Sequence, residues 1–173
     1  QPEKKVHVFN SKSASGGQSL IAMKIIECEE KGLSFGEVVS EVEKYIEEMS
    51  TFFVLENLET LRKNGRLSRV KALVASALKI KPVMGSTPEG TICQLDQARG
   101  MNKAIVKMVD HIGEKGINIP EKTVVITHCT CPERAKMLEE AIREKLHPAK
   151  IVVMDTAGVS SMYANDGGVI VAV

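Results

Sequence analysis

Four cations surround a single glycine in the segment LRKNGRLSR, which spans Leu61–Arg69 and contains no acidic residue. Such a cluster is typical of a solvated helix end, a nucleic-acid patch, or a seat for one anionic group. Cations stabilise the carbonyl end of a helix, and this accounts well for Arg62 and Lys63. It accounts less well for Arg66, which follows Gly65 in a tight link between two predicted helices. An anion-binding role for Arg66 therefore stays open.

The glycine-rich loop Ser11–Gly17 is a second place where an anion could bind, because it joins a predicted strand to a predicted helix. Free backbone N–H groups at a helix N-terminus attract anions, and glycine lets a ligand approach the backbone closely. Ser15 adds a hydroxyl group to this loop. Most Gly/Ser-rich turns bind nothing, and the segment does not match the G-x-x-x-x-G-K-[ST] pattern of a Walker-type nucleotide site.

The segment HCTCP, His128–Pro132, contains residue types that bind zinc or exchange disulfides. A single C-x-C with one adjacent histidine supplies too few well-spaced ligands for a structural zinc site. The spacing also differs from the C-x-x-C of thioredoxin-like proteins. We therefore predict that His128, Cys129 and Cys131 bind no metal, and that the cysteines act as small hydrophobic residues between a strand and a helix.

The composition argues against several classes of protein. The 173 residues carry a formal net charge of +1, whereas general polyanion binders usually present a strongly basic surface. No apolar run is long enough to cross a bilayer, and the 4 cysteines do not resemble the dense framework of a small secreted domain. We expect a cytoplasmic protein without membrane insertion. The chain begins at Gln1 with no initiator methionine, so we expect a fragment or a processed chain.

The hydrophobic pattern predicts the elements that position these residues. A buried strand is expected at Val6–Phe9, a helix at Gln18–Lys31, and a second helix that begins with a capping box of Ser34 and Glu37. Further strands are predicted at 51–57, 81–86, 91–95, 123–128, 150–155 and 167–173, and further helices at 57–65, 68–81, 101–112 and 132–146. This order predicts an α/β fold, with helices packed against a mixed β-sheet over residues 51–173. Residues 1–50, in the order β–α–α, look like the tail of another α/β unit.

The segment FFVLENLETLRKNGRLSRVKALVASALKIKPVMGSTPEGTICQLDQARGMNKA resembles the DegV family of bacterial fatty-acid-binding proteins. The family pattern runs from a strand through tLeyLrkgGRis and lLnIKPil to dG and kvRg.kka, and the sequence meets it nearly in full. The segment VHVFNSKSASGGQSLIA resembles the earlier family motif v.viDS...S.G.G, with Asn10 in place of the usual aspartate. The match runs in register from Val6 to Val173.

The resemblance implies two lobes, an N-terminal Rossmann-like lobe and a mixed-sheet lobe, with a long-chain fatty acid bound between them. The acyl tail would lie in an apolar tunnel and the carboxylate on hydroxyl groups. The resemblance also implies a binding subunit that is not itself an enzyme. In family members that serve a fatty-acid kinase, a separate dihydroxyacetone-kinase-like protein phosphorylates the bound carboxylate, and the binding protein presents the acyl phosphate to phospholipid synthesis.

The family match assigns roles to individual residues. Arg66 matches the arginine near the lipid head group, where a planar, permanently charged guanidinium suits a carboxylate. Ser15 and Tyr163 are the other predicted head-group residues. Arg99, in QARGMNKA, matches a second arginine that is placed for the kinase partner and the phosphate-transfer step. The apolar positions at helical spacing could line part of the tunnel, although a plain core role is the alternative: Val70, Val74 and Leu78.

The sequence departs from the family in two ways. The N-terminal portion with the Thr and Ser that hold the carboxylate would precede Gln1, so we expect this chain to bind fatty acid more weakly than an intact relative. We also expect self-association or a copurifying N-terminal piece. The C-terminal loop, usually H-T-G-P-G, reads YANDG at Tyr163–Gly167. Tyr163 therefore replaces the family histidine, and it can donate a hydrogen bond but is not cationic near pH 7.

Two other functional classes stay open. A small-molecule phosphotransferase could use the glycine-rich loops around Gly16 and Gly167, with Asp155 and Asp166 as candidate metal-binding acids. A basic-helix nucleic-acid binder would use the cations of Leu61–Arg69. Neither interleaved aromatic residues nor further basic faces accompany those cations, so we expect no nucleic-acid partner.

Overall fold

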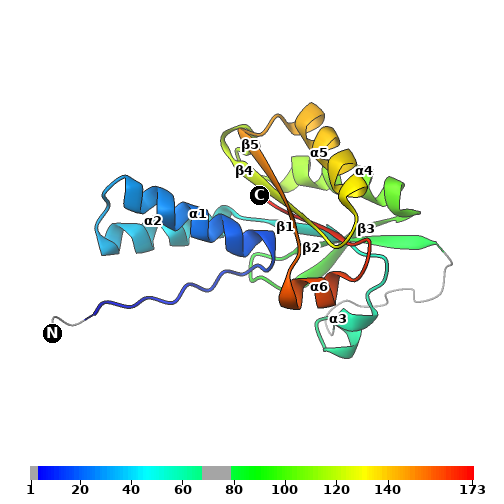
Figure 1. Cartoon of the computed structure of the whole chain (residues 1–173), viewed down its shortest axis with the longest axis horizontal. Coiled ribbons are helices and arrows are strands. Elements are labelled where there is room, and N and C mark those ends of the chain that lie inside the picture. Colours follow the sequence, from blue (N-terminus) through cyan, green and yellow to red (C-terminus); the bar gives the residue numbers. More distant parts are fainter. Residues whose placement is uncertain (1–3, 68–78) are drawn as a thin grey trace.

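Six strands form one sheet in the order β3–β2–β1–β6–β4–β5 (Figure 1). The computed structural model describes residues 4–67 and 79–173 of the chain. The strands are Thr51–Val54 (β1), Ile80–Ser86 (β2), Ile92–Arg99 (β3), Thr123–His128 (β4), Lys150–Asp155 (β5) and Val169–Ala172 (β6). Strands β4 and β5 are parallel, and the other neighbouring pairs are antiparallel. The predicted α/β fold with a mixed sheet is confirmed.

Helices cover both faces of this sheet (Figure 1). Helices α4 and α5 lie on one face, and α1, α3 and α6 lie on the other. Their bounds are Gly16–Glu30 (α1), Phe35–Glu48 (α2), Glu59–Lys63 (α3), Met101–Lys115 (α4), Pro132–Leu146 (α5) and Gly158–Ala164 (α6), with a 3-10 turn at Ile119–Glu121. Among the described residues, no helix combines the length and the apolar character that a membrane crossing requires.

Strand β1 is buried on both faces and divides the hydrophobic residues into two cores. Phe52 and Val54 pack with α4 and α5 in the larger core. Phe53 and Leu55, which follows the strand, lie on the opposite face and pack with α3 and α6. Because successive strand residues point to opposite faces, a single short strand serves both layers.

The long amphipathic helix α4 closes the larger core. The buried positions recur every three or four residues, as the sequence predicts: Met101, Ala104, Ile105, Met108, Val109 and Ile112. This spacing places one apolar stripe against the sheet. The capping box at the start of α2 is also present, and the Ser34 N–H donates to the Glu37 carboxylate at 2.8 Å.

Helices α1 and α2 form a hairpin that projects from one end of the sheet (Figure 1). They pack on each other through Ile21, Cys28, Val42 and Ile46. The first turn of α1 also lies on β4, where a Cβ atom added at Gly16 would come within 2.8 Å of a Val125 methyl group. Since α1 contacts both α2 and the sheet, the division of the chain at residue 50 stays a prediction.

The predicted buried strand at Val6–Phe9 is wrong. The segment is extended but has no strand partner among the described residues, and Val6 and Val8 are 79% and 86% exposed. It runs alongside the α1–α2 hairpin (Figure 1), and nearby Lys12 pairs with Glu47 of α2 at 2.6 Å. A strand needs a hydrogen-bonding neighbour, and an apolar pattern cannot supply one.

Two further elements differ from the predicted ones. Strand β3 continues past Leu95 to Arg99 and stays paired with β2 on both sides of a register shift, at which Leu95 lies opposite the Val83–Met84 step. Helix α6 was not predicted, since its 7 residues carry no capping signal and too few turns for a periodic pattern. The helix predicted from residue 68, with the tunnel candidates Val70, Val74 and Leu78, lies outside the described residues.

Substitution of Ile105 tests the placement of α4. Ile105 is 1% exposed, so Ile105→Ala should lower the free energy of unfolding by about 2–5 kcal/mol through lost burial and a residual cavity. Val106, the next residue, is 58% exposed, and Val106→Ala should change it by less than about 0.5 kcal/mol. Urea unfolding followed by circular dichroism gives both values. Equal losses in the two variants would contradict this packing of α4.

Candidate functional site

A cavity of about 660 Å³ opens on the face of the sheet that carries α3 and α6. Its floor is apolar and belongs to the smaller core described above. The floor residues come from strands β1, β3 and β6, from helices α3 and α6, and from the loop after β1: Phe53, Leu55, Leu61, Ile92, Ala164 and Ile170. A cavity of this size with an apolar floor suits a small organic ligand or a lipid chain.

One rim of the cavity is rich in hydroxyl groups, which come from the loop before α1 and from the ends of β1, β2 and β3. The hydroxyl of Ser13 lies 2.6 Å from that of Thr51, and the Thr51 N–H donates to the Ser86 hydroxyl at 3.1 Å. The hydroxyl of Ser15 lies 2.9 Å from that of Thr127 on β4. Each hydroxyl can still offer a donor or an acceptor to a ligand, because it has more than one hydrogen-bonding site.

The loop that carries these serines has an unusual backbone. Lys12 and Ser15 have φ angles of 50° and 54°, in the left-handed region that non-glycine residues rarely adopt. Gly90, at the tip of the β2–β3 hairpin, packs on this loop, and a Cβ atom added there would come within 2.7 Å of the Lys12 Cα. Strained backbone held by its surroundings often occurs at ligand sites.

The three predicted head-group residues, Ser15, Arg66 and Tyr163, all line this one cavity. They come from the loop before α1, the end of α3 and helix α6, and are far apart in the sequence. The structure therefore brings them together. Sequence reasoning did not single out Ser13 within the Ser11–Gly17 loop, and it missed Thr51, whose only signal was a hydroxyl at the start of a strand.

The end of α3 explains why Arg66 differs from the neighbouring cations. The N–H of Gly65, at φ 69°, donates to Arg62 O at 3.0 Å, and the N–H of Arg66 donates to Leu61 O at 2.8 Å. These two bonds form a Schellman motif, which turns the chain sharply and aims Arg66 at the cavity. Its exposed guanidinium donates to the Asn64 carbonyl at 3.0 Å.

The other described cations of this segment share the single carboxylate of an acid just before it. Arg62 and Lys63 pair with Glu59 at 2.7 Å and 3.5 Å. The hydrogen bond from Arg62 lowers the pKa of Glu59 to about 2. Within residues 4–67 and 79–173, no carboxylate forms an ion pair with Arg66. Among the described residues that line the cavity, Lys12 pairs with Glu47, so Arg66 is the lining cation without an ion pair.

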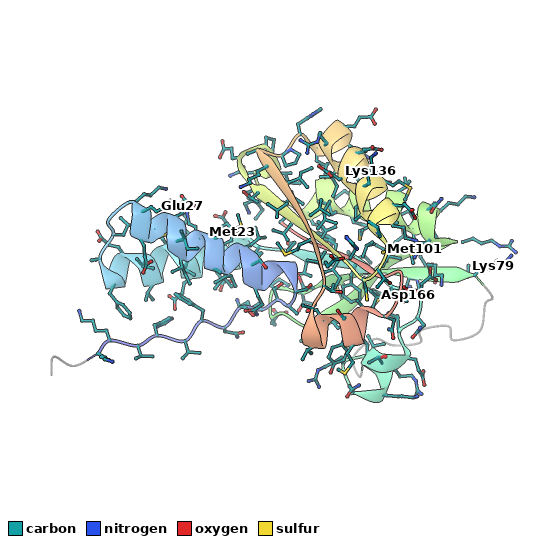
Figure 2. The ribbon with its side chains drawn as sticks, viewed as in Figure 1. Met23, Glu27, Lys79, Met101, Lys136 and Asp166 are labelled. Atoms are coloured by element: carbon teal, nitrogen blue, oxygen red, sulfur yellow. The ribbon has the colours of Figure 1, made fainter. Side chains whose placement is uncertain are left out.

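Arg99 does not line the cavity. It ends β3, whereas Ile92 at the other end of the same strand lies in the cavity floor. The 8 residues of β3 separate these ends by about 24 Å. Figure 2 shows Lys79 at the end of the sheet away from α1. The Lys79 carbonyl accepts a hydrogen bond from the N–H of Gly100, the residue after Arg99, so Arg99 lies at this end too. The structure thus separates Arg99 from the predicted head-group residues.

The glycines of the phosphotransferase hypothesis have packing roles. Gly16 allows α1 to approach Val125, as described above, and Gly167 lies against Arg134 and Glu56. Of the acids, Asp155 lies 3.4 Å from His128 and Asp166 accepts a hydrogen bond from Thr130. No observation here favours phosphotransfer by this chain.

The two cysteines of the HCTCP segment lie in different environments. Cys129 packs with the cavity floor, whereas Cys131 packs with the larger core on the other face of the sheet. Burial raises the pKa of the Cys131 thiol. Among the described residues, no three His, Cys, Asp or Glu side chains are grouped so that they could hold a metal ion.

An ion-pair network lies beside the cavity and joins β1, β2 and α5. Glu56, just after β1, pairs with Lys81 at 2.5 Å and with Arg134 at 2.6 Å. Desolvation alone would raise the pKa of Glu56, but the hydrogen bonds from Lys81 and Arg134 outweigh it and lower the pKa below 4.5. Glu56 is therefore ionised throughout the neutral range and fixes both cations.

Comparison with known proteins identifies similar chains. A family model described as an uncharacterised protein of the DegV family matches residues 1–173. A DegV domain-containing protein of Streptococcus pneumoniae is 34% identical over 169 residues. That alignment covers 98% of this chain and 59% of the relative, so the chain spans about three fifths of the length of that protein.

Solved structures agree with this relationship. A DegV family protein from Ruminococcus gnavus, refined with vaccenic acid, is 55% identical with a TM-score of 0.95 and covers 99% of this chain and 61% of that one. The Fatty Acid Kinase (Fak) B3 protein of Streptococcus pneumoniae, loaded with linoleic acid, is 33% identical with a TM-score of 0.88. Its match covers 99% of this chain and 60% of the pneumococcal one.

The network around Glu56 gives a pH-dependent prediction. Because the folded pKa of Glu56 is lowered, its contribution to stability is present above the unfolded value near 4.5 and is lost as the pH falls through the folded value. Glu56→Gln should therefore cost about 1–3 kcal/mol at pH 7, and this difference from the wild type should shrink progressively below pH 4.5. Urea unfolding at several pH values measures it.

Glu139 provides the control, since among the described residues it pairs with a single cation, Arg143, whose side chain is 60% exposed. Glu139→Gln should change the free energy of unfolding at pH 7 by less than about 1 kcal/mol. If the Glu56→Gln deficit were the same at neutral and acid pH, the network would not owe its stability to the Glu56 charge.

Proposed function

The chain belongs to the DegV family, and we propose that it binds a long-chain fatty acid in the cavity, with the tail on the apolar floor and the carboxylate at the rim. The convergence of Ser15, Arg66 and Tyr163 on one cavity carries this proposal. The fatty acids in the Ruminococcus gnavus and pneumococcal structures support it, since both proteins are more than 30% identical to this chain.

Burial of the tail supplies the main driving force. A methylene group contributes about 0.8 kcal/mol when it leaves water, so a chain of about sixteen carbons offers roughly 10 kcal/mol before the cost of association. Floor residues such as Phe53 and Leu55 are 8% and 3% exposed, so they are already part of a formed apolar surface. A preformed floor lowers the ordering cost that binding must offset.

The rim suits a carboxylate better than a neutral head group. Arg66 offers a guanidinium that forms no ion pair among the described residues, and the hydroxyls of Ser15 and Tyr163 can donate hydrogen bonds. Tyr163 occupies the position of the family histidine and brings no positive charge at neutral pH. Lys12 also lines the cavity but pairs with Glu47, so among the described residues the charge complementarity depends mainly on Arg66.

We further propose that the bound carboxylate is presented to a separate kinase of the dihydroxyacetone-kinase-like type in the cytoplasm, and that this chain performs no catalysis itself. The name of the pneumococcal relative, a Fatty Acid Kinase protein, supports this role. Arg99 would contact the kinase, since it is exposed and lies outside the cavity.

Arg66→Ala tests the head-group proposal. A hydrogen-bonded charge contributes roughly 1.5–3 kcal/mol, so the variant should bind a fluorescent long-chain fatty acid at least about tenfold more weakly. The matching fluorescent fatty alcohol, which lacks the carboxylate, should bind wild type and variant alike. Fluorescence titration gives both dissociation constants.

Arg62→Ala is the matched control, because Arg62 lies on the same helix but is paired with Glu59 outside the cavity. It should bind both probes as the wild type does. If the wild type takes up neither probe, the proposed function is wrong. If Arg66→Ala and Arg62→Ala bind the acid equally well, the head group lies elsewhere.

Arg99→Ala separates binding from presentation. The variant should keep the fatty-acid affinity of the wild type, since Arg99 is remote from the cavity, while phosphorylation of the bound acid by the purified kinase should fall about tenfold. Arg99→Lys should rescue this only in part, because a lysine cannot form a bidentate fork. Unchanged phosphorylation in Arg99→Ala would show that Arg99 is not part of the kinase interface.

A further inference from the structure

The loop between α6 and β6 determines where Tyr163 lies. Asn165, just after α6, has φ 56°, and its side-chain amide donates to the Tyr163 carbonyl at 3.1 Å. The same side chain accepts a hydrogen bond from Thr60 of α3 at 3.3 Å. Asn165 therefore joins α6, which carries Tyr163, to α3, which carries Arg66 at its end.

The second half of this loop is fixed to the sheet. The Gly167 N–H donates to Cys129 O at 2.9 Å, and the Cys129 N–H donates to Gly168 O at 3.0 Å. The Gly167 carbonyl accepts a further hydrogen bond, from Arg134 Nη1 at 2.6 Å. A Cβ atom at Gly167 would collide with the same Nη1 atom, so the guanidinium lies directly against the backbone.

Arg134 occupies a place where a cation is unfavourable. It lies in the first turn of α5, next to the positive end of the helix dipole, and its side chain is only 30% exposed. Glu56 offsets this cost, since its carboxylate accepts from Arg134 Nη2 at 2.6 Å. Lys81 in turn donates to the Glu56 carbonyl at 2.7 Å and holds the glutamate in place.

We infer that Arg134 is a positioning residue for ligand binding: its two nitrogens bridge Glu56 and the Gly167 carbonyl, and this bridge sets the place of Tyr163 at the cavity rim. The effect on binding rests on the proposed function, whereas the effect on Tyr163 does not. The bridge needs a forked side chain, because one nitrogen serves the carboxylate and the other the carbonyl. Lysine has a single nitrogen and cannot span both partners with the same geometry.

The composition of the chain offers a direct probe of Tyr163. The chain has 2 tyrosines and no tryptophan, so Tyr45→Phe leaves Tyr163 as its only strong intrinsic fluorophore. Tyr45 lies on α2, outside the cavity, near α1 and the start of β4. Acrylamide quenching of this single tyrosine then reports how firmly it is held at the rim.

In the Tyr45→Phe background, Arg134→Met should raise the quenching constant roughly twofold, because a released loop exposes the ring. Arg134→Lys should fall between Arg134→Met and the parent. Arg143→Met is the matched control, since Arg143 lies on the same helix, is 60% exposed, and among the described residues pairs only with Glu139. It should leave quenching unchanged. All comparisons are made at pH 7 in proteins that circular dichroism shows to be folded.

Affinity for the fluorescent fatty acid provides the second readout. Arg134→Met should weaken binding about tenfold and Arg143→Met should not. If the parent binds no fatty acid but the quenching differences appear, the proposed function fails and the positioning role stands. If Arg134→Met matches the parent in both readouts, the inference is wrong. Should Arg134→Met fail to fold, Glu56→Gln removes the other end of the bridge and must raise quenching in the same way.

Discussion

The burial of β1 on both faces is the constraint on which the rest of the structure depends. Phe52 and Val54 complete the core under α4 and α5, while Phe53 and the following Leu55 form the floor of the cavity. One strand thus separates the layer that stabilises the fold from the layer that can accept a ligand. The strand cannot relieve a polar substitution on one face by shifting its register, because a shift of one residue would exchange the side chains of the two faces.

The cavity combines this floor with a rim on which Arg66 is, among the described residues, the cation without an ion pair. In sequence, a solvated helix end accounted for Arg62 and Lys63 but less well for Arg66. In the structure, Arg62 and Lys63 share the Glu59 carboxylate, whereas Arg66 follows the Schellman turn at Gly65 and lines the cavity. A local backbone motif therefore distinguishes a residue that lines the cavity from a solvated one. Arg134 is likewise fixed by a local partner: it lies near the positive end of the α5 dipole, and its ion pair with Glu56 offsets that cost.

Features that depend on neighbouring residues could be predicted from the sequence. The apolar period of α4 and the capping box at Ser34 are both local, and both are confirmed. The strand order, the hydroxyl pair of Ser13 and Thr51, and the bridge from Glu56 to Arg134 join residues far apart in the chain, and no local pattern encodes them. The failure at Val6–Phe9 has the same origin, since a strand requires a partner that the segment itself does not specify. Arg66, Tyr163 and Ser15 were found through family resemblance, and only the fold explains why they meet.

The most direct test is carbon-13 NMR of palmitate labelled at its carboxyl carbon and bound to the chain. A carboxylate held by Arg66 and hydroxyl donors keeps its charge to lower pH than a free one, because both interactions favour the ionised form. We predict a bound carboxyl signal that titrates at lower pH than that of free palmitate, and that moves back toward the free value in Arg66→Ala. A bound signal that titrates like free palmitate in wild type and variant alike would contradict the account.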